Sequence, residues 1–124
     1  MSLTEEEAIA LVQNAQAKQN QGDYKGALKD FTVFLSYAQE TGNTAWEGAA
    51  YSNIGNAHNK LGNYQDALKY HHKYLEIALQ LGDKGGEGRA YGNIGLAHNN
   101  LGNYQDALKY HYKKLELSIP FYSI

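Results

Sequence analysis

Cysteine is absent from this chain of 124 residues, and proline occurs once, at Pro120. Without thiols the chain can form neither a disulfide framework nor a thiolate metal site, and it has no cysteine nucleophile. Because proline interrupts helices more strongly than any other residue, its near absence permits long helices almost throughout. The composition therefore favours helices that no covalent cross-link holds together.

Excess charge and long apolar runs are also missing. Eleven Lys and Arg face thirteen Asp and Glu, so the net charge is −2, and no block of like charge stands out. Nucleic acids and anionic membranes are therefore not expected as partners. No stretch approaches the ~18 apolar residues of a membrane span, and glutamates stand near the start where a signal peptide has basic residues. We expect a cytoplasmic protein.

The chain repeats itself with a period of 40 residues. The eleven letters LGNYQDALKYH stand at 61–71 and again at 101–111, and only eight of thirty positions differ between 50–79 and 90–119. A fainter copy lies at 22–28. A fixed period of this length is typical of repeat arrays. We expect a single array with units at about 4–42, 43–82 and 83–119, and a tail at 120–124.

Each unit is predicted to be a pair of helices. In the second unit, apolar or small residues recur at spacings of three and four through 51–61 and again through 64–78. Between these stretches Gly62 suits the left-handed residue that ends a helix, and Asn63 is predicted to cap the next one. The first helix of each unit keeps an apolar stripe that only a neighbouring unit can cover. The fold class is therefore predicted to be all-α.

The histidines are interpreted as packing residues. His58 and His98 share one repeat-equivalent position and His71 and His111 share another, and the helical pattern places both positions in the core, whereas His72 is extra. No HExxH motif and no carboxylate at ligand spacing accompanies them, so we expect neither metal nor cofactor. A further hypothesis is that protonation of buried histidines below about pH 6 lowers stability.

No catalytic motif is found. The stretch GDKGGEGR at 82–89 lacks the order of a phosphate-binding loop, and no strand is expected before it. Its glycines are expected to serve the turn between two helices. No Ser/His/Asp arrangement or carboxylate pair stands out, so an enzyme is not expected.

The repeat resembles a known family. The residues that carry the resemblance are Tyr51, Ile54-Gly55, His58, Gly62-Asn63-Tyr64, Ala67-Leu68 and Leu75, and their order is similar to the tetratricopeptide repeat. The 40-residue period and the wording GDKGGEGRAYGNIG resemble the lengthened subclass of Pins-type G-protein-signalling modulators. The resemblance covers nearly the whole chain. It implies a right-handed superhelical α-solenoid and a scaffold that binds a protein or an extended peptide in a concave groove.

In this family the first helices of the units line the groove. By analogy the groove residues here are Gln13, Gln16, Ala49, Asn53, Asn56, Lys60, Arg89, Asn93, Leu96 and Asn100. Asparagine side chains both donate and accept, so several in a row can pair with the backbone of a peptide, and Arg89 can bind a carboxylate. The alternative is that these asparagines are only solvated. A carboxylate-clamp adaptor is not expected, because Val12, Ser52 and Gly92 stand where that class has a lysine.

The predicted last helix leaves an apolar face with nothing after it to cover it. Its candidate self-association residues are Leu108, Leu115, Ile119, Phe121 and Tyr122. Three explanations remain open: the chain is a fragment of a longer array, the tail folds back, or two chains form a homodimer through this helix. The alternative to a peptide-binding scaffold is therefore a structural or self-assembling module, including an engineered one.

Overall fold

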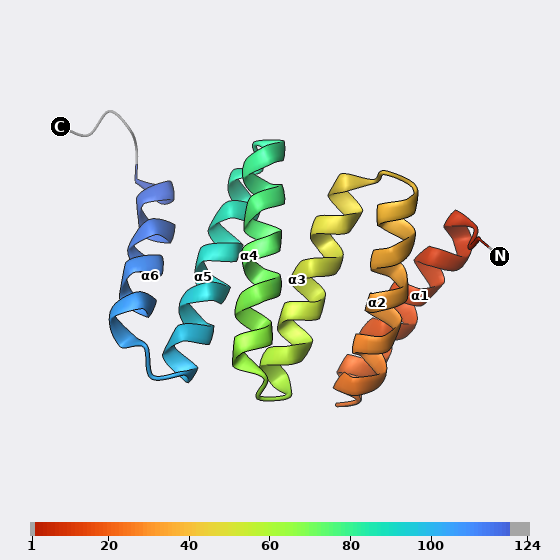
Figure 1. Ribbon diagram of the computed structural model, residues 1–124, viewed down its shortest axis with the longest axis horizontal. Coiled ribbons are helices and arrows are strands. Elements are labelled where there is room, and N and C mark those ends of the chain that lie inside the picture. Colours follow the sequence, from red (N-terminus) through yellow and green to blue (C-terminus); the bar gives the residue numbers. More distant parts are fainter. Residues whose placement is uncertain (1, 120–124) are drawn as a thin grey trace.

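The computed structural model describes residues 2–119, which form six α-helices and no strand. In chain order these are α1 (Glu5–Asn20), α2 (Tyr24–Glu40), α3 (Thr44–Lys60), α4 (Tyr64–Leu81), α5 (Lys84–Asn100) and α6 (Tyr104–Ser118). We call α1, α3 and α5 the A helices and α2, α4 and α6 the B helices. The helices stand side by side in chain order, with α1 and α6 at opposite ends (Figure 1). The prediction of an all-α solenoid of helix pairs is confirmed. Within these residues no helix is long and apolar enough to cross a membrane.

Every corner between two helices is built on a glycine. Gly22, Gly42, Gly62, Gly82 and Gly102 all have φ between 67° and 82°, a left-handed conformation that only glycine adopts without strain. The amide that follows each glycine bonds back to a carbonyl of the last helical turn, as the Asn63 amide does to the His58 carbonyl at 2.8 Å. Gly62 therefore ends a helix as predicted, and Gly42 and Gly82 do the same.

The starts of the helices use side-chain caps, with two exceptions, α4 and α6. Thr4 and Glu7 form a reciprocal capping box on α1, as the sequence predicts. At α4 the residue before the helix is Asn63, but its side chain makes no capping bond. Its amide instead lies 3.4 Å from Nδ1 of His58, across the corner on the preceding helix. Asn63 therefore occupies the N-cap position as predicted but lacks the side-chain bond of a cap, and its repeat equivalent Asn103 does the same.

The hydrophobic core runs without a break from one helix pair to the next. Phe31 of α2 is fully buried against Ala15 of α1 and Ile54 of α3, so the first two pairs share one cluster. Tyr74 of α4 and Ala90 of α5 lie together in another cluster, which joins the second pair to the third. The prediction that neighbouring pairs bury one another's apolar stripes is confirmed.

Of the histidines predicted in the core, only His71 is buried, with 1% of its surface exposed. A Cβ added at Gly55 would lie 2.7 Å from the His71 ring, so this glycine makes room for the imidazole. His58 and His98 are half-buried and stack on tyrosines at the side of each helix pair. His111 is exposed, because no described helix follows α6. The prediction of core positions for these last three is therefore wrong.

Candidate functional site

Three hollows lie along the A helices and share lining residues. The first is lined by Ile9, Val12, Gln13, Phe34, Trp46, Ala49 and Asn53. The second is lined by Gln19, Asn20, Tyr24, Asn53, Asn56, Asn59, Lys60 and Leu96. The third is lined by Ala45, Gly48, Ala49, Tyr74, Ile77, Ala78, Leu81, Asp83 and Arg89. Ala49 lines both the first and the third hollow, and Asn53 lines both the first and the second, so the hollows are neighbours. We call them together the A-helix groove.

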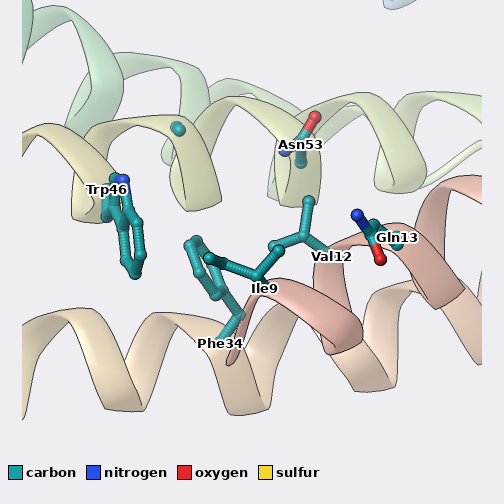
Figure 2. A pocket seen from close by; sticks show the side chains of 7 residues that line it. Ile9, Val12, Gln13, Phe34, Trp46 and Asn53 are labelled. Atoms are coloured by element: carbon teal, nitrogen blue, oxygen red, sulfur yellow. The ribbon is translucent and has the colours of Figure 1, made fainter. Parts of the chain in front are cut away.

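The first hollow is an apolar pocket of about 240 Å³. Figure 2 shows the side chains of Ile9 and Val12 from α1, Phe34 from α2 and Trp46 from α3 converging on it. The ring centroids of Phe34 and Trp46 are 5.4 Å apart, so the aromatic wall is packed against itself. Asn53 marks its polar edge. A pocket of this composition suits a bulky apolar side chain.

The second hollow, of about 400 Å³, is rich in amides. It brings together four of the residues that the sequence placed in a groove: Asn53, Asn56, Lys60 and Leu96. The first three lie on α3, at spacings of three and four residues that put them on one face of the helix. Leu96 reaches the same hollow from α5. The hollow therefore offers donors and acceptors along one side and an apolar contact from α5.

Arg89 stands in the third hollow, of about 220 Å³. One guanidinium nitrogen donates to the hydroxyl of Tyr74 at 3.1 Å, and this hydrogen bond raises the pKa of Arg89 above its usual value. The bond fixes the orientation of the arginine on the wall of the groove. Its remaining N–H groups leave a cation that can bind a carboxylate or a backbone carbonyl.

Three of the ten predicted groove residues lie outside these three hollows. Gln16 is exposed and lines none of them. Asn93 is half-buried and lines none of them. Asn100 is exposed, and its amide donates to the Asn59 side chain at 3.2 Å, which links α5 to α3 at the rim of the second hollow. Seven of the ten predicted groove residues thus line the hollows, and Asn100 lies beside them.

Sequence reasoning missed the apolar pocket. It named Ala49 as a groove residue but not Ile9, which the 40-residue period places at the equivalent position one unit earlier. Phe34 and Trp46 reach the pocket from a B helix and from the first turn of α3. No family pattern assigned those two positions to the groove. The 40-residue period could have predicted Ile9, whereas the positions of Phe34 and Trp46 depend on how the helices pack in space.

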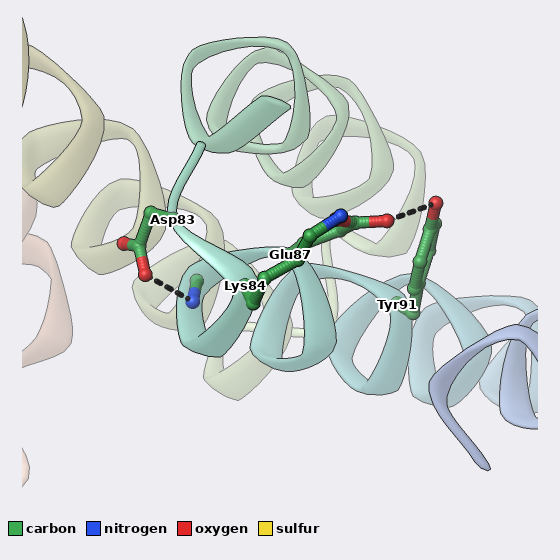
Figure 3. A network of polar contacts seen from close by, with 5 residues as sticks. Asp83, Lys84, Glu87 and Tyr91 are labelled. Carbon is green, nitrogen blue, oxygen red and sulfur yellow. Dashed lines mark hydrogen bonds and ion pairs between the residues drawn. The ribbon is translucent and has the colours of Figure 1, made fainter. Parts of the chain in front are cut away.

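A polar network at the start of α5 has a structural explanation (Figure 3). The Glu87 carboxylate, almost fully buried, accepts a hydrogen bond from the Tyr91 hydroxyl at 3.0 Å and pairs with Lys84 at 3.4 Å. Burial, followed by this hydrogen bond, raises the pKa of Tyr91. The same bond occurs 40 residues earlier, where the hydroxyl of Tyr51 donates to Glu47 at 3.0 Å. This tyrosine–glutamate hydrogen bond is therefore part of the repeat, and it joins the first two turns of α3 and of α5.

Among residues 2–119, no three His, Asp or Glu side chains lie where they could hold a metal ion together. The histidines instead pair with aromatic rings: His58 stacks on Tyr70 with an interplanar angle of 10°, and His98 stacks on Tyr110 at 13°. The edge of the His72 ring meets Tyr110, which connects α4 to α6. These contacts assign the histidines to packing between helices.

Comparison with protein families identifies the repeat. A family model described as tetratricopeptide repeat matches residues 46–118, more than half of the chain. The chain belongs to the tetratricopeptide repeat family. Domains of this family generally mediate protein–protein interactions, and the fold is typically a non-enzymatic interaction module. A comparison with curated proteins returns no match.

Solved structures of tetratricopeptide repeat domains superpose closely on this one. The TPR domain of Arabidopsis FLU is 23% identical, has a TM-score of 0.85, and matches over 90% of this chain and 94% of its own. The N-terminal domain of stress-induced protein-1 from C. elegans is 15% identical, with a TM-score of 0.77, over 91% and 85%. MamA is 24% identical, with a TM-score of 0.71, over 89% and 54%. At these identities the likeness establishes the shared fold alone.

Proposed function

We propose that this tetratricopeptide repeat array is a non-catalytic scaffold that holds an extended peptide segment of a partner protein in the A-helix groove. The observation that carries the proposal is that an apolar pocket and an amide-lined hollow lie next to each other and share Asn53 as a lining residue. A folded partner presents few groups that could reach both hollows at once. An extended segment presents side chains and free backbone groups together.

Recognition would divide between the two hollows. The amides of Asn53 and Asn56 can donate to and accept from the backbone of the segment, which gives affinity for any sequence. The apolar pocket beside Trp46 would accept one bulky apolar side chain, and this contact would select among sequences. Lys60 and Arg89 add positive charge in the second and third hollows, which favours a segment with carboxylates outside its apolar anchor.

Two finer assignments belong to the same proposal. The Pins-type subclass is supported by the 40-residue period and by Arg89, which stands in an EGRA stretch and faces the groove. One array with units at about 4–42, 43–82 and 83–119 agrees with the order of the helix pairs. Phe121 and Tyr122, named from the sequence as self-association residues, lie outside the described residues.

Removing two groove amides is expected to weaken peptide binding about tenfold. Asn53→Ala combined with Asn56→Ala deletes two hydrogen-bonding side chains, each contributing about 0.5–1.5 kcal/mol. The measurement is a titration with a peptide selected from an array on the natural chain, with helicity followed by circular dichroism. The matched control is Asn14→Ala combined with Asn99→Ala, two exposed asparagines on A helices outside the groove. Equal affinity of both double variants for the peptide would contradict the site.

Blocking the apolar pocket is expected to cost at least about tenfold in affinity for the same peptide, because a buried apolar anchor contributes about 1.5–3 kcal/mol. The change is Ile9→Lys, which places a charge at the pocket on a residue that is 41% exposed and so tolerates substitution. The control is Val33→Lys, a residue 43% exposed on α2 and outside the groove. A peptide whose affinity survives Ile9→Lys would show that the pocket holds no anchor.

A further inference from the structure

The outer face of α6 carries a stripe of exposed side chains. Tyr104, Leu108, His111 and Leu115 recur at intervals of four, three and four residues, which places them on one side of the helix. Tyr104 is 69% exposed, Leu108 54% and Leu115 53%. We call these four residues the α6 stripe. It contains no carboxylate, lysine or arginine.

The chain contains its own example of how such a stripe is covered. The equivalent residues 40 positions earlier, on α4, are the same four types: Tyr64, Leu68, His71 and Leu75. There His71 is buried and the other three are half-buried. The cover is α5, which lies against α4, and Leu75 packs on the cluster that contains Ala90 of α5. These four positions of α6 therefore carry the side chains that α5 covers on α4, whereas Tyr74 of the same α4 face is replaced on α6 by the exposed Lys114.

The α1 end of a second copy is a poor cover. Where α3 presents buried Ala50, Ile54 and Ala57 to α2, the equivalent positions of α1 are exposed. At the position of Ile54, α1 has Asn14, and at the position of Trp46 it has Glu6. Packing this face on Leu108 and Leu115 would bury an amide and a carboxylate without partners, at a cost in free energy. Head-to-tail stacking is therefore disfavoured.

A second α6 is a better match, because the stripe is its own complement. Intervals of four, three and four read the same in both directions, so a copy turned end for end presents side chains at the same heights. Tyr104 of one copy then lies opposite Leu115 of the other, and Leu108 lies opposite His111. This alternation of four and three is the spacing at which two helices pack side chains between one another. The contact is isologous, because a two-fold rotation exchanges the two copies and maps the contact onto itself. It therefore closes at two chains.

We propose that two copies of this chain pair through antiparallel α6 helices about a two-fold axis between Leu108 and His111. The pairing leaves the A-helix groove of each copy open, because every residue that lines the groove precedes α6 and the stripe lies on α6. A homodimer of this kind presents two grooves. It is independent of the identity of the peptide that either groove binds.

The first test is the mass in solution as concentration rises. The natural chain is expected to approach twice its 13.8 kDa at high micromolar concentration and to stop there. Leu108→Lys combined with Leu115→Lys is expected to remain monomeric, since it places two like charges in the seam. The control, Val33→Lys combined with Leu79→Lys, changes two exposed apolar residues on other B helices and should still pair. A monomer at all concentrations, masses that grow beyond two chains, or a dimer insensitive to the α6 changes would each overturn the proposal.

The second test fixes the direction of pairing and uses the absence of native cysteine. Chains with Tyr104→Cys and chains with Leu115→Cys are mixed and oxidised. Cross-links between the two variants should exceed, several-fold, those within either variant alone, because antiparallel pairing places these positions opposite each other. Preferential cross-linking of each variant to itself would overturn the antiparallel arrangement. Peptide affinity of the Leu108 and Leu115 double variant, measured in parallel, separates failure of this pairing from failure of the groove.

Discussion

Lowering the pH from about 7 to about 5 is expected to reduce the free energy of unfolding by about 2 kcal/mol through His71 alone. Burial of this imidazole, with a smaller effect of the neighbouring His72, lowers its pKa from 6.5 to about 4 in the folded chain. Between those two values the unfolded chain binds more protons than the folded one, so stability falls as the pH falls. The full loss, about 3 kcal/mol, is reached below the folded pKa.

The measurement is the melting temperature across this pH range, where a loss of about 2 kcal/mol corresponds to a fall of about 5–10 °C. His71→Gln removes this titrating group and should reduce the slope of the profile, leaving the contribution of His72, whose pKa burial also lowers. His111→Gln changes the exposed repeat equivalent and should leave the slope of the natural chain unchanged. A natural chain whose melting temperature stays level from about pH 8 to about pH 5 would contradict the assignment to His71.

Replacing Gly55 by valine is expected to destabilise the chain by about 3 kcal/mol, whereas the same change at Gly95 should cost about 1 kcal/mol or less. At both positions a Cβ would meet an imidazole ring, at 2.7 Å from His71 and at 2.8 Å from His111. The two rings differ in freedom. His71 is enclosed between α3 and α5, whereas His111 can turn outward into solvent.

Urea denaturation of both valine variants measures the difference, and each is the control for the other because both glycines follow Asn-Ile at repeat-equivalent positions of an A helix. Helix propensity contributes equally to both, since valine replaces glycine in the middle of an A helix in each case. Equal losses of stability at Gly55 and Gly95 would contradict the expected difference, because they would mean that the His111 ring on α6 is no freer to move than the His71 ring on α4. The comparison should be made at low protein concentration, where pairing through α6 is absent.

The repeat made the fold predictable. Near-identity between residues 50–79 and 90–119 fixed the period, and helical spacing on either side of Gly62 fixed where one helix ends and the next begins. These signals are local, so they do not depend on knowing which side chains meet in space. The same reasoning places Asn53 and Asn56 off the buried face of α3, and the resemblance to the repeat family assigns that face to a groove.

What the sequence did not predict depends on contacts between elements. Periodicity treats His71 and His111 as equivalent. His71 is buried because α5 packs on α4, whereas His111 is exposed because no described helix follows α6. Asn63 has the residue type and position of a cap, yet its amide lies close to His58 instead of the helix amides. The apolar pocket needs Phe34 and Trp46 from different helices. In each case the outcome is set by what stands nearby in space.

Trp46 is the only tryptophan of the chain, and it forms a wall of the apolar pocket beside Phe34. The emission wavelength of an indole follows the polarity of its surroundings, so a ligand that displaces water from this pocket shifts the spectrum towards the blue. The eleven tyrosines do not obscure the signal when the indole is excited selectively. The protein therefore carries a built-in fluorescent reporter for occupancy of its first hollow, and occupancy can be followed without attaching any dye.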